Sequence, residues 1–571
     1  MLVTYLAPQW RRVVLLALLV LTGIALKLIN PQVIRYIIDT AIAGGALGTL
    51  TGAAILFIGI ALLNQAIAIA ATYLSENIAW LTTNQLRTDL VAHCLTLDIA
   101  FHKVHTSGEL IERIDGDVDT LSTFFTTLII HLLGNVILLI GILVLLFRED
   151  WRIGWATTAF ALLALLILIR IRHYATRWWI AIRQKSADFY GFLGEQLGGT
   201  EDIRANGATS YVMSRFYAHL RSWLPLEYRA NLAGYSMWIT TLSVFAVGNA
   251  VAFALGAYLL SLGAITIGTV YLMFYYIDLL EQPMQQIRSQ LVELQKAAAS
   301  IQRVNELLHT RPAIEDTGTM DLPAGALSIE FDNLSFGYTN EHTVLYNLSF
   351  QLKPGHVLGV LGRTGSGKTT LARLLLRLYD YSSGGLCVGG IPIEKVSLRN
   401  LRQHIGMVTQ DVQLFHASVR NNLTFFDCAI SDDRIIKVLD DIGLSAWFRS
   451  LPNGLDTELG SDGNGLSAGE AQLLAFARVF LANPGLVILD EASSRLDPAT
   501  EQLIERAVTK LLEGRTGIVI AHRLATIGRA DEILLLQDGK MLEYGPRTEL
   551  LRNPASQFAR LLQTGLEEVH A

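Results

Sequence analysis

The sequence predicts a two-part protein in which an all-α transmembrane domain of six helices is fused to an α/β domain. Three observations predict this fold class. Hydrophobic residues form 51% of the 571-residue chain and charged residues only 17%, with a mean hydropathy of +0.39, which suits a partly membrane-embedded chain. Six long apolar stretches lie in the first half. From about Ser328 the composition becomes that of a soluble α/β domain.

Length, charge and cysteine content narrow the class further. A chain of 571 residues is too long for one ordinary core, so several domains are expected. The net charge of -6 is small for this length and gives no sign of a nucleic-acid partner. Cys94, Cys387 and Cys428 are scattered without metal-ligand spacing, which favours three ordinary thiols. The first apolar run is too long for a signal peptide, so no cleavable leader is expected.

The six apolar stretches are predicted to cross the membrane. They cover residues 13–35, 50–74, 123–146, 155–171, 237–260 and 265–280. Most of them reach the ~20 residues that a helix needs to cross ~30 Å of hydrocarbon. Short turns follow the first, third and fifth stretch, whereas long polar helical segments follow the second and fourth. The short turns therefore lie on one side of the membrane and the long loops on the other.

Basic residues set the predicted orientation. The N-terminus and the long loops are rich in arginine and lysine, and two of the three short turns carry no charge. In membrane proteins the cytoplasmic loops carry an excess of arginine and lysine. We therefore expect a multi-pass plasma-membrane protein with both termini and the α/β domain in the cytoplasm. Residues 5–12 combine aromatic side chains, Pro8 and arginines, which favours a short helix in contact with membrane lipid; a frayed terminus is the alternative.

Three charged residues fall within or at the end of predicted spans. Lys27 lies well inside the first, and Asp278 and Glu281 share one face near the inner end of the sixth. A charge at bilayer depth costs about 2.5–3.5 kcal/mol on insertion scales, so it should face a cavity or a partner. Either these residues line a translocation pathway, or the sixth helix has already left the hydrocarbon at Asp278.

Two short stretches interrupt the long cytoplasmic helices, at residues 101–110 and 205–211. Both combine glycine with small polar residues, as the tip of a helical hairpin does. Such a tip is either a solvated turn or a contact to the following domain. The predicted boundaries are residues 1–308 for the transmembrane domain, 309–327 for a linker and 328–571 for the α/β domain.

The α/β domain contains a phosphate-binding loop. Residues 362–369 match the pattern G-x-x-x-x-G-K-[ST], between an apolar strand and a helical run. Backbone amides and the helix N-terminus then face a polyphosphate, Lys368 reaches the β- and γ-phosphates, and Thr369 ligates Mg²⁺. The predicted ATP-binding residues are Tyr338, Gly362, Arg363, Thr364, Gly365, Ser366, Gly367, Lys368, Thr369 and Thr370.

Further polar residues follow predicted strands. Asp490 and Glu491 end the run Leu-Val-Ile-Leu, where Asp490 suits Mg²⁺ and Glu491 suits polarisation of the attacking water. Gln410 could reach both Mg²⁺ and that water, and His522 the γ-phosphate. Tyr338 could stack on adenine. Taken singly, each of these is more often an ordinary strand-end or core residue.

Together these motifs resemble an ATP-binding cassette (ABC) exporter half-transporter of the bacterial multidrug or lipid type. The resemblance covers nearly the whole chain and implies a six-helix transmembrane domain fused to an α/β P-loop nucleotide-binding domain. It rests on the order of the phosphate loop, Gln410, the segment 466–470, Asp490 with Glu491, the segment 494–497 and His522. It implies ATP with Mg²⁺ held by Thr369, Gln410 and Asp490, and catalysis by Glu491, His522 and Gln410.

The resemblance also implies a dimer with two shared ATP sites. The signature residues would act in trans on the nucleotide of the partner; they are Ser467, Ala468, Gly469 and Glu470. The tips near His102 and Ala208 resemble the coupling helices of the family. Ala468 replaces the usual glycine and Glu470 the usual glutamine, a departure found in heterodimeric members. A heterodimer with a second half-transporter is therefore favoured over a homodimer.

The expected function is ATP-driven export by alternating access, with a small molecule, a lipid or a peptide as substrate. The sequence does not choose between these substrates. The alternative is a membrane-bound, ATP-dependent regulator that gates a partner without transporting. The residues for hydrolysis are present, which argues against that alternative.

Overall fold

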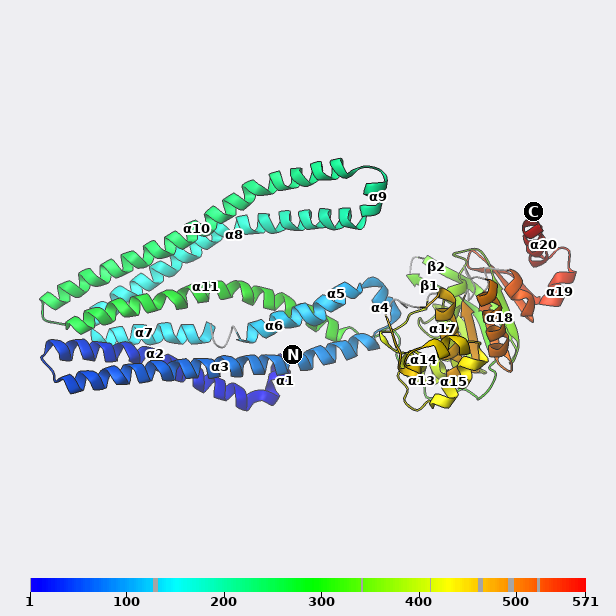
Figure 1. Ribbon diagram of the computed structural model, residues 1–571, viewed down its shortest axis with the longest axis horizontal. Coiled ribbons are helices and arrows are strands. Elements are labelled where there is room, and N and C mark those ends of the chain that lie inside the picture. The colour runs from blue at the N-terminus through cyan, green and yellow to red at the C-terminus, as the bar shows by residue number, and fades with distance from the viewer. Residues whose placement is uncertain are drawn as a thin grey trace. The chain divides into compact units, whose positions relative to one another are not determined.

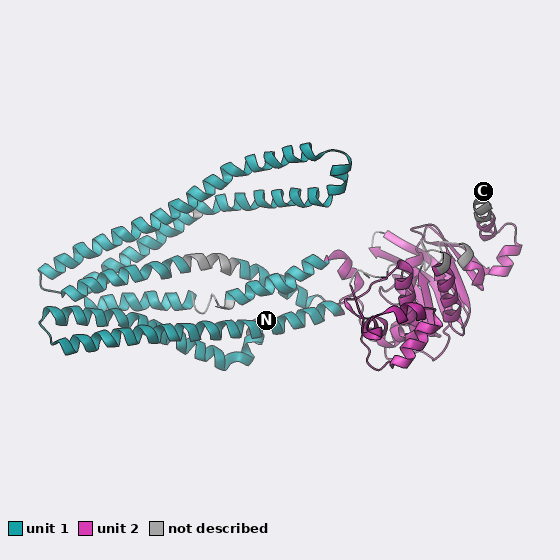
Figure 2. Cartoon of the chain, viewed as in Figure 1, with its two compact units in different colours: residues 1–95, 107–310 teal, residues 96–106, 311–571 magenta. Residues whose placement is uncertain are grey.

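The structure, a computed structural model, describes residues 2–126, 132–339, 342–410, 412–460, 466–490, 498–520 and 524–570. The chain divides into two compact units (Figure 2). Unit 1 comprises residues 1–95 and 107–310, and unit 2 comprises residues 96–106 and 311–571. Unit 1 is helical throughout its described part, and the β-sheets belong to unit 2 (Figure 1).

Unit 1 is built from helices much longer than the apolar stretches of the sequence. The elements in order are α1 (Leu2–Leu6), η1 (Ala7–Gln9), α2 (Trp10–Ile42), α3 (Leu47–Thr96), α5 (Ser107–Ile111), the π-helical η2 (Glu112–Gly116), α6 (Asp117–Thr126), α7 (Gly134–Glu149), α8 (Trp151–Gly198), α9 (Thr200–Ala205), α10 (Thr209–Ser261) and α11 (Ile267–His309). At 1.5 Å per residue α3 is about 75 Å long, far more than a bilayer requires. Hydropathy marks only the part of each helix that suits hydrocarbon.

Four of these helices have the length and apolar composition to cross a membrane. Among the described residues they correspond to α2 with its preceding turn, α3, α8 and α10. The third predicted span falls on the end of α6 and on α7, and the sixth on α11. The described part of α7 has only 16 residues, and Asp278 and Glu281 lower the apolar content of α11. Residues 127–131 of the third predicted span lie outside the described residues.

Helices α8 and α10 form an antiparallel pair. They run side by side and meet at α9, where their ends stand apart from the other helices of unit 1 (Figure 1). The turn into α8 is a single residue, Asp150, whose carboxylate accepts the backbone N–H of Arg152 at 2.7 Å and so caps the helix. Large side chains on the part of α10 near α9 are exposed, including Tyr211, Leu224 and Tyr228.

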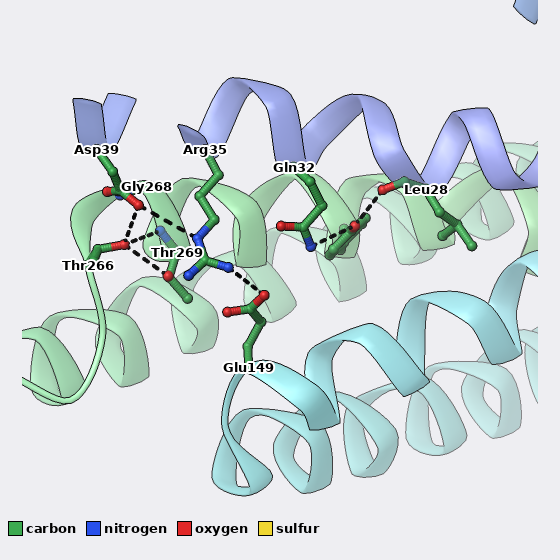
Figure 3. Close-up of polar contacts among 9 residues, drawn as sticks. Leu28, Gln32, Arg35, Asp39, Glu149, Thr266, Gly268 and Thr269 are labelled. Carbon is green, nitrogen blue, oxygen red and sulfur yellow. Dashed lines mark hydrogen bonds and ion pairs between the residues drawn. The ribbon is translucent and has the colours of Figure 1, made fainter. Parts of the chain in front are cut away.

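A polar cluster joins the ends of α2, α7 and α11 that lie next to the short turns (Figure 3). Asp39 accepts the hydroxyl of Thr266 at 2.8 Å and the backbone N–H of Gly268 at 2.9 Å. Arg35 lies 3.6 Å from Asp39 and 2.5 Å from Glu149. A Cβ on Gly268 would stand 2.6 Å from a carboxylate oxygen of Asp39, so only glycine fits there. We call these five residues the short-turn clamp.

The core of unit 1 lies between α2, α7, α8, α10 and α11. Its largest fully buried side chain, Tyr276, donates its hydroxyl to the carbonyl of Leu28 at 2.8 Å and lies 3.4 Å from the amide of Gln32 (Figure 3). Farther along α11, Arg303 and Ser300 both donate to buried Asp117 on α6. These contacts fix α11 against both ends of the unit.

The described part of unit 2 contains two large sheets and one small one. The four-stranded antiparallel sheet has the order β2 (His342–Leu352), β1 (Ile329–Thr339), β4 (Ser383–Val388) and β5 (Ile391–Pro392). The six-stranded sheet has the order β12 (Lys540–Pro546), β11 (Glu532–Gln537), β3 (Val357–Leu361), β10 (Thr516–Ile520), β9 (Leu486–Asp490) and β6 (Ile405–Val408). All its pairings are parallel except β11 with β12. Strands β7 (Ala417–Ser418) and β8 (Glu458–Leu459) form a small third sheet.

The helical elements of unit 2 are α4 (Ile99–Val104), α12 (Lys368–Leu375), η4 (Ile393–Lys395), α13 (Leu398–His404), α14 (Val419–Thr424), α15 (Asp432–Asp441), α16 (Ser445–Ser450), η5 (Gly454–Asp456), α17 (Ala468–Ala482), α18 (Pro498–Leu512), η6 (Leu524–Arg529), α19 (Arg547–Arg552) and α20 (Gln557–His570). Among them α14, α15, α17 and α18 share a hydrophobic core with the six-stranded sheet. Every residue of β3, β9 and β10 is buried. Alternate side chains enter opposite cores, so Leu358 packs with the strands β1 and β2 while Val357 packs with α17 and α18.

Candidate nucleotide-binding site

The candidate site lies where four parallel strands end together. β3, β10, β9 and β6 are consecutive neighbours in the sheet, and Asp490 is level with Ile520 across the β9–β10 pairing. The phosphate loop follows β3, Asp490 is the last residue of β9, and Gln410 comes two residues after β6. Carboxyl ends of parallel strands line the ligand crevice of an open α/β sheet. The topology therefore brings these predicted site residues to one edge.

Glycines allow the loop to pass close to neighbouring backbone. Gly362 has φ 151°, and a Cβ there would lie 2.2 Å from the carbonyl oxygen of Leu536. Gly367, with φ 100°, is the N-cap of α12, and a Cβ there would lie 2.4 Å from a methyl group of Leu345. Any other residue would force these neighbours apart. The glycine requirement of the sequence pattern is thus a property of this packing.

The loop gathers donors around its centre. Lys368 is only 5% exposed, and its ammonium donates to the carbonyls of Gly362 at 2.7 Å and Arg363 at 3.1 Å. The buried hydroxyl of Ser366 has no hydrogen-bond partner in the part of the chain that the structure describes. Thr369 is half-buried in the first turn of α12. A buried cation, an unsatisfied hydroxyl and a helix N-terminus together fit a polyphosphate.

Tyr338 belongs to the same site. Its hydroxyl lies 3.1 Å from that of Thr370 and accepts a hydrogen bond from Arg373 at 3.0 Å. Tyr338 is 38% exposed, and its ring contacts that of Tyr379 edge-on, with centroids 5.0 Å apart. An exposed aromatic face beside the loop suits stacking with a nucleobase.

One residue of this neighbourhood was not predicted from the sequence. The ammonium of Lys103 lies 4.5 Å from the ring centroid of Tyr338 and 5.5 Å from that of Tyr379. Lys103 lies on α4, at the tip between α3 and α5, and this tip belongs to unit 2. The backbone N–H of Ala313 donates to Asp98 at 2.8 Å, which also ties the tip to unit 2. The signal in the sequence that could have identified Lys103 was its positive charge within the interrupted stretch 101–110.

The described residues contain no group of three or more His, Cys, Asp or Glu side chains suited to a metal ion. Oxygen ligands for Mg²⁺ would come instead from the strand ends. Asp490 is 6% exposed at the end of β9, whereas Gln410 is exposed. Glu491, His522 and residues 494–497 lie outside the described residues.

The signature segment forms the start of α17. Ser467 caps the helix by accepting the N–H of Glu470 at 3.2 Å, and the Glu470 carboxylate accepts the N–H of Ser467 at 2.7 Å. This is a capping box. Ser467 and Ala468 are exposed, and Gly469 is buried. The Glu470 carboxylate therefore neutralises part of the positive partial charge at the N-terminus of α17.

A phosphate loop at the strand ends of an α/β unit, joined in one chain to membrane-length helices, defines an ATP-driven membrane transporter. The chain belongs to the ABC transporter family. Residues 13–284 match the family model described as ABC transporter transmembrane region, and residues 345–494 match the model described as ABC transporter.

Similar proteins share nearly the full length of the chain. The ATP-dependent lipid A-core flippase of Alcanivorax borkumensis is 32% identical over 82% of this chain and 80% of its own. The fatty acid ABC transporter ATP-binding/permease protein of Mycobacterium bovis is 30% identical over 82% of this chain and 74% of its own. The structure of a bacterial Atm1-family ABC exporter with ATP bound has a TM-score of 0.81, with 27% identity and 98% coverage of both chains.

These matches confirm the predicted resemblance and the fusion of a helical transmembrane domain to a nucleotide-binding domain. They also confirm the predicted function. The chain is a multi-pass membrane exporter that binds nucleotide, and its ATPase activity drives transport.

Proposed function

We propose that the chain is one half of a dimeric exporter in which ATP binds between two cassettes. Lys368 and the amides of residues 362–369 hold the phosphates, and Tyr338 holds the adenine. The carrying observation is the buried Ser366 hydroxyl, which has no hydrogen-bond partner among the described residues, in the same loop as the buried Lys368 ammonium; both donors suit phosphate oxygens. ATP hydrolysis would reset the transport cycle.

The proposed chemistry is attack of water on the γ-phosphorus, giving ADP and phosphate. Mg²⁺, when bound, neutralises charge on the β- and γ-phosphates. Thr369, Asp490 and Gln410 supply the oxygen ligands that this ion prefers. Glu491 positions or deprotonates the water, and His522 contacts the γ-phosphate. Asp490 at the buried end of β9 supports this arrangement.

The test is Glu491→Gln, with Glu549→Gln on α19 as a matched exposed control. We expect the first variant to bind ATP and accumulate in the ATP-bound dimer, and the control to turn over normally. Hydrolysis by purified protein in lipid nanodiscs, together with retention of labelled ATP, measures both. Normal turnover in Glu491→Gln would overturn its role, and absence of any ATP retention in Glu491→Gln would overturn the site.

We further propose that the second half-transporter is a different chain. The Glu470 carboxylate would oppose a γ-phosphate at the positive end of α17, so an ATP site capped by this segment would be the weaker of two. A partner with an unaltered signature would complete the site at this chain's own loop. If the chain purified alone forms a dimer with full transport-coupled ATPase activity, the homodimer is correct.

The proposed membrane orientation has both termini and unit 2 in the cytoplasm of the plasma membrane. The excess of arginine and lysine in the long loops supports it. The proposed boundaries remain residues 1–308, 309–327 and 328–571. Labelling by a membrane-impermeant thiol reagent of single cysteines placed in the turn at residues 43–46 tests this orientation.

A further inference from the structure

Two arginines contact the indole of one tryptophan where α8 and α10 lie side by side. The guanidinium carbon of Arg177 lies 5.0 Å from the ring centroid of Trp178 on the same helix, and that of Arg229, on α10, lies 5.3 Å from it. Arg177 also lies 4.5 Å from the ring centroid of Tyr174. We call Arg177, Trp178 and Arg229 the interfacial cluster. Two helices therefore hold two positive charges beside one aromatic ring.

The segments that carry the cluster are poor in acidic residues. Residues 151–187 of α8 include six arginines and lysines and no aspartate or glutamate. Residues 219–238 of α10 include one acidic residue, Glu227. Its carboxylate accepts the indole N–H of Trp223 at 3.1 Å and the amide of Asn231 at 3.3 Å. The electrostatic potential around the cluster is therefore positive, which favours an anion.

The cluster lies at the level of the lipid headgroups. At the start of α8, Trp151 is 64% exposed and has the guanidinium of Arg152 5.7 Å from its ring centroid, a pairing typical of a membrane interface. From Trp151 to Trp178 the helix rises about 40 Å, at about 1.5 Å per residue. A bilayer with its headgroups is about 40–45 Å thick. With Trp151 in one headgroup layer, Trp178 therefore lies in the opposite layer, on the side of the long loops.

Helix α10 indicates the same level independently. The side chains of Tyr228, Tyr235 and Trp238 are each at least 64% exposed, next to the apolar stretch 237–260. Exposed tyrosine and tryptophan side chains gather at the headgroup level of membrane proteins. Arg229 lies beside Tyr228, so both arginines of the cluster enter the same layer, from two helices that run side by side (Figure 1).

Further basic and aromatic side chains share the face of α8 that carries the cluster. Arg170 and Tyr174 precede Trp178 by eight and four residues, and Lys185 follows it by seven, which is the spacing of one helix face. The long side chain of Arg170 reaches from the edge of the hydrocarbon toward the headgroups. Guanidinium groups donate paired N–H groups to phosphate oxygens. This face therefore matches a phosphate group in charge, in hydrogen bonding and in depth.

We propose that the interfacial cluster binds the phosphate of an anionic phospholipid in the leaflet on the side of the long loops, and that this lipid links α8 to α10. Charge complementarity favours an anionic headgroup, and the depth of the cluster favours a lipid over a soluble anion. The lipid is a fixed neighbour of the transporter and not its cargo. The inference requires only that α8 and α10 cross the membrane. It does not depend on the proposed ATP site, dimer or orientation.

The experiment titrates dioleoyl phosphatidylglycerol into the full chain, with its partner if it has one, in detergent micelles. Native mass spectrometry resolves the first bound lipid and gives its Kd, and dioleoyl phosphatidylcholine is the zwitterionic control probe. We expect Arg177→Gln and Arg229→Gln each to weaken binding of the first phosphatidylglycerol about fivefold, as loss of one basic residue beside an anionic headgroup does. Arg177→Lys should keep most of the binding, and phosphatidylcholine should bind all variants alike.

Arg221→Gln is the matched control, because it removes an exposed arginine of α10 eight residues before Arg229, beyond the headgroup layer. It should bind phosphatidylglycerol like the wild type, and an equal loss in this variant would overturn the proposal. The two test substitutions lie on different helices, so each one tests the cluster if the other does not fold. Wild-type binding in either folded variant overturns the proposal. So does displacement of the lipid by inorganic phosphate at an ionic strength matched with chloride, which would assign a soluble anion.

Thermal unfolding tests the link between the helices. Phosphatidylglycerol should raise the Tm of the wild type more than that of Arg229→Gln, because a ligand stabilises the fold that binds it. An equal rise in both proteins overturns the link.

Transport of labelled phosphatidylglycerol in proteoliposomes separates a fixed lipid from a cargo. We expect any ATP-driven movement of this lipid to be the same in Arg177→Gln and the wild type. Movement that is lost in Arg177→Gln would make the lipid a cargo and overturn its role as a fixed neighbour. Loss of all ATP hydrolysis in a preparation whose Kd values depend on Arg177 and Arg229 contradicts the proposed ATP site and leaves the lipid site intact.

Discussion

The ammonium of Lys103 stands 4.5 Å from the ring centroid of Tyr338, so a residue from the tip between α3 and α5 contacts the proposed adenine site. An exposed cation–π contact contributes about 0.5–1 kcal/mol. We expect Lys103→Met to hydrolyse ATP but to transport fewer molecules for each ATP consumed. Lys103→Arg, which keeps the cation, is the control. An unchanged transport-to-hydrolysis ratio in Lys103→Met would contradict a role for this contact in coupling.

Glu470→Gln should strengthen the ATP site that α17 caps. Removal of the carboxylate takes away a negative charge at a helix N-terminus, where such charges interact by about 0.3–1 kcal/mol, so ATP should bind about two- to fivefold more tightly there. Labelled ATP binding to the assembled dimer measures this. Glu470→Asp, which keeps the charge, should bind like the wild type; tighter binding in both variants would point to a packing effect.

Thr369→Val should raise the Mg²⁺ concentration needed for half-maximal ATP hydrolysis. The substitution removes a proposed metal ligand in the first turn of α12 without changing the side-chain shape. Thr548→Val is the matched control, because Thr548 is exposed on α19 and lies outside the proposed site. A Mg²⁺ titration of hydrolysis checks both variants. Identical titration curves for Thr369→Val and the wild type would remove Thr369 from the metal site.

The short-turn clamp should contribute to the stability of unit 1. Asp39→Asn weakens the contacts to Arg35, Thr266 and Gly268, and we expect a loss of about 1–3 kcal/mol in the free energy of unfolding. A double-mutant cycle with Thr266→Val, followed by thermal unfolding in detergent, isolates the Asp39–Thr266 pair. Strictly additive effects of the two substitutions would mean that this hydrogen bond contributes nothing.

Cys387 and Cys428 should differ in their reactivity with maleimide. Burial, together with nearby Glu330, raises the pKa of the Cys387 thiol above its ordinary value of 9.0, so little reactive thiolate is present near pH 8. Cys428 is exposed and should be labelled first. The Cys387 rate should continue to rise above pH 9, because its thiolate forms only there. Mass spectrometry after timed labelling distinguishes the two sites, and faster labelling of Cys387 at pH 8 would contradict this.

The phosphate loop could be predicted from the sequence because its requirements are local. Gly362 and Gly367 are needed where the backbone passes within van der Waals distance of its neighbours, and Lys368 follows at a fixed spacing. The capping box at Ser467 and Glu470 was equally readable, since serine followed three residues later by glutamate is its signature. The sequence interpretation treated Glu470 only as a departure from the family pattern.

The contact between Lys103 and Tyr338 could not be predicted in this way. More than 200 residues separate the two, and nothing in either local pattern requires the other. The length of the membrane helices needed more than hydropathy. Apolar stretches alone underestimate it, but the polar segments after the second and fourth stretches were predicted to be helical, and α3, α8 and α10 include them.

The length of α11 has a mechanical consequence. Its 43 residues form a rod about 65 Å long, which begins at the short-turn clamp and ends at His309, two positions before unit 2 resumes at Arg311. A rigid tilt of only about 5° at one end would displace the other by about 6 Å, as the length of such a helix dictates. Pro283 is the one proline within α11, and it removes a backbone donor at a point along this rod. Bending at Pro283 would reduce this displacement, because only the part of α11 on one side of the proline would then tilt. The stiffness of the helical turn at Pro283 therefore determines how much of a tilt at one end of α11 reaches the other end.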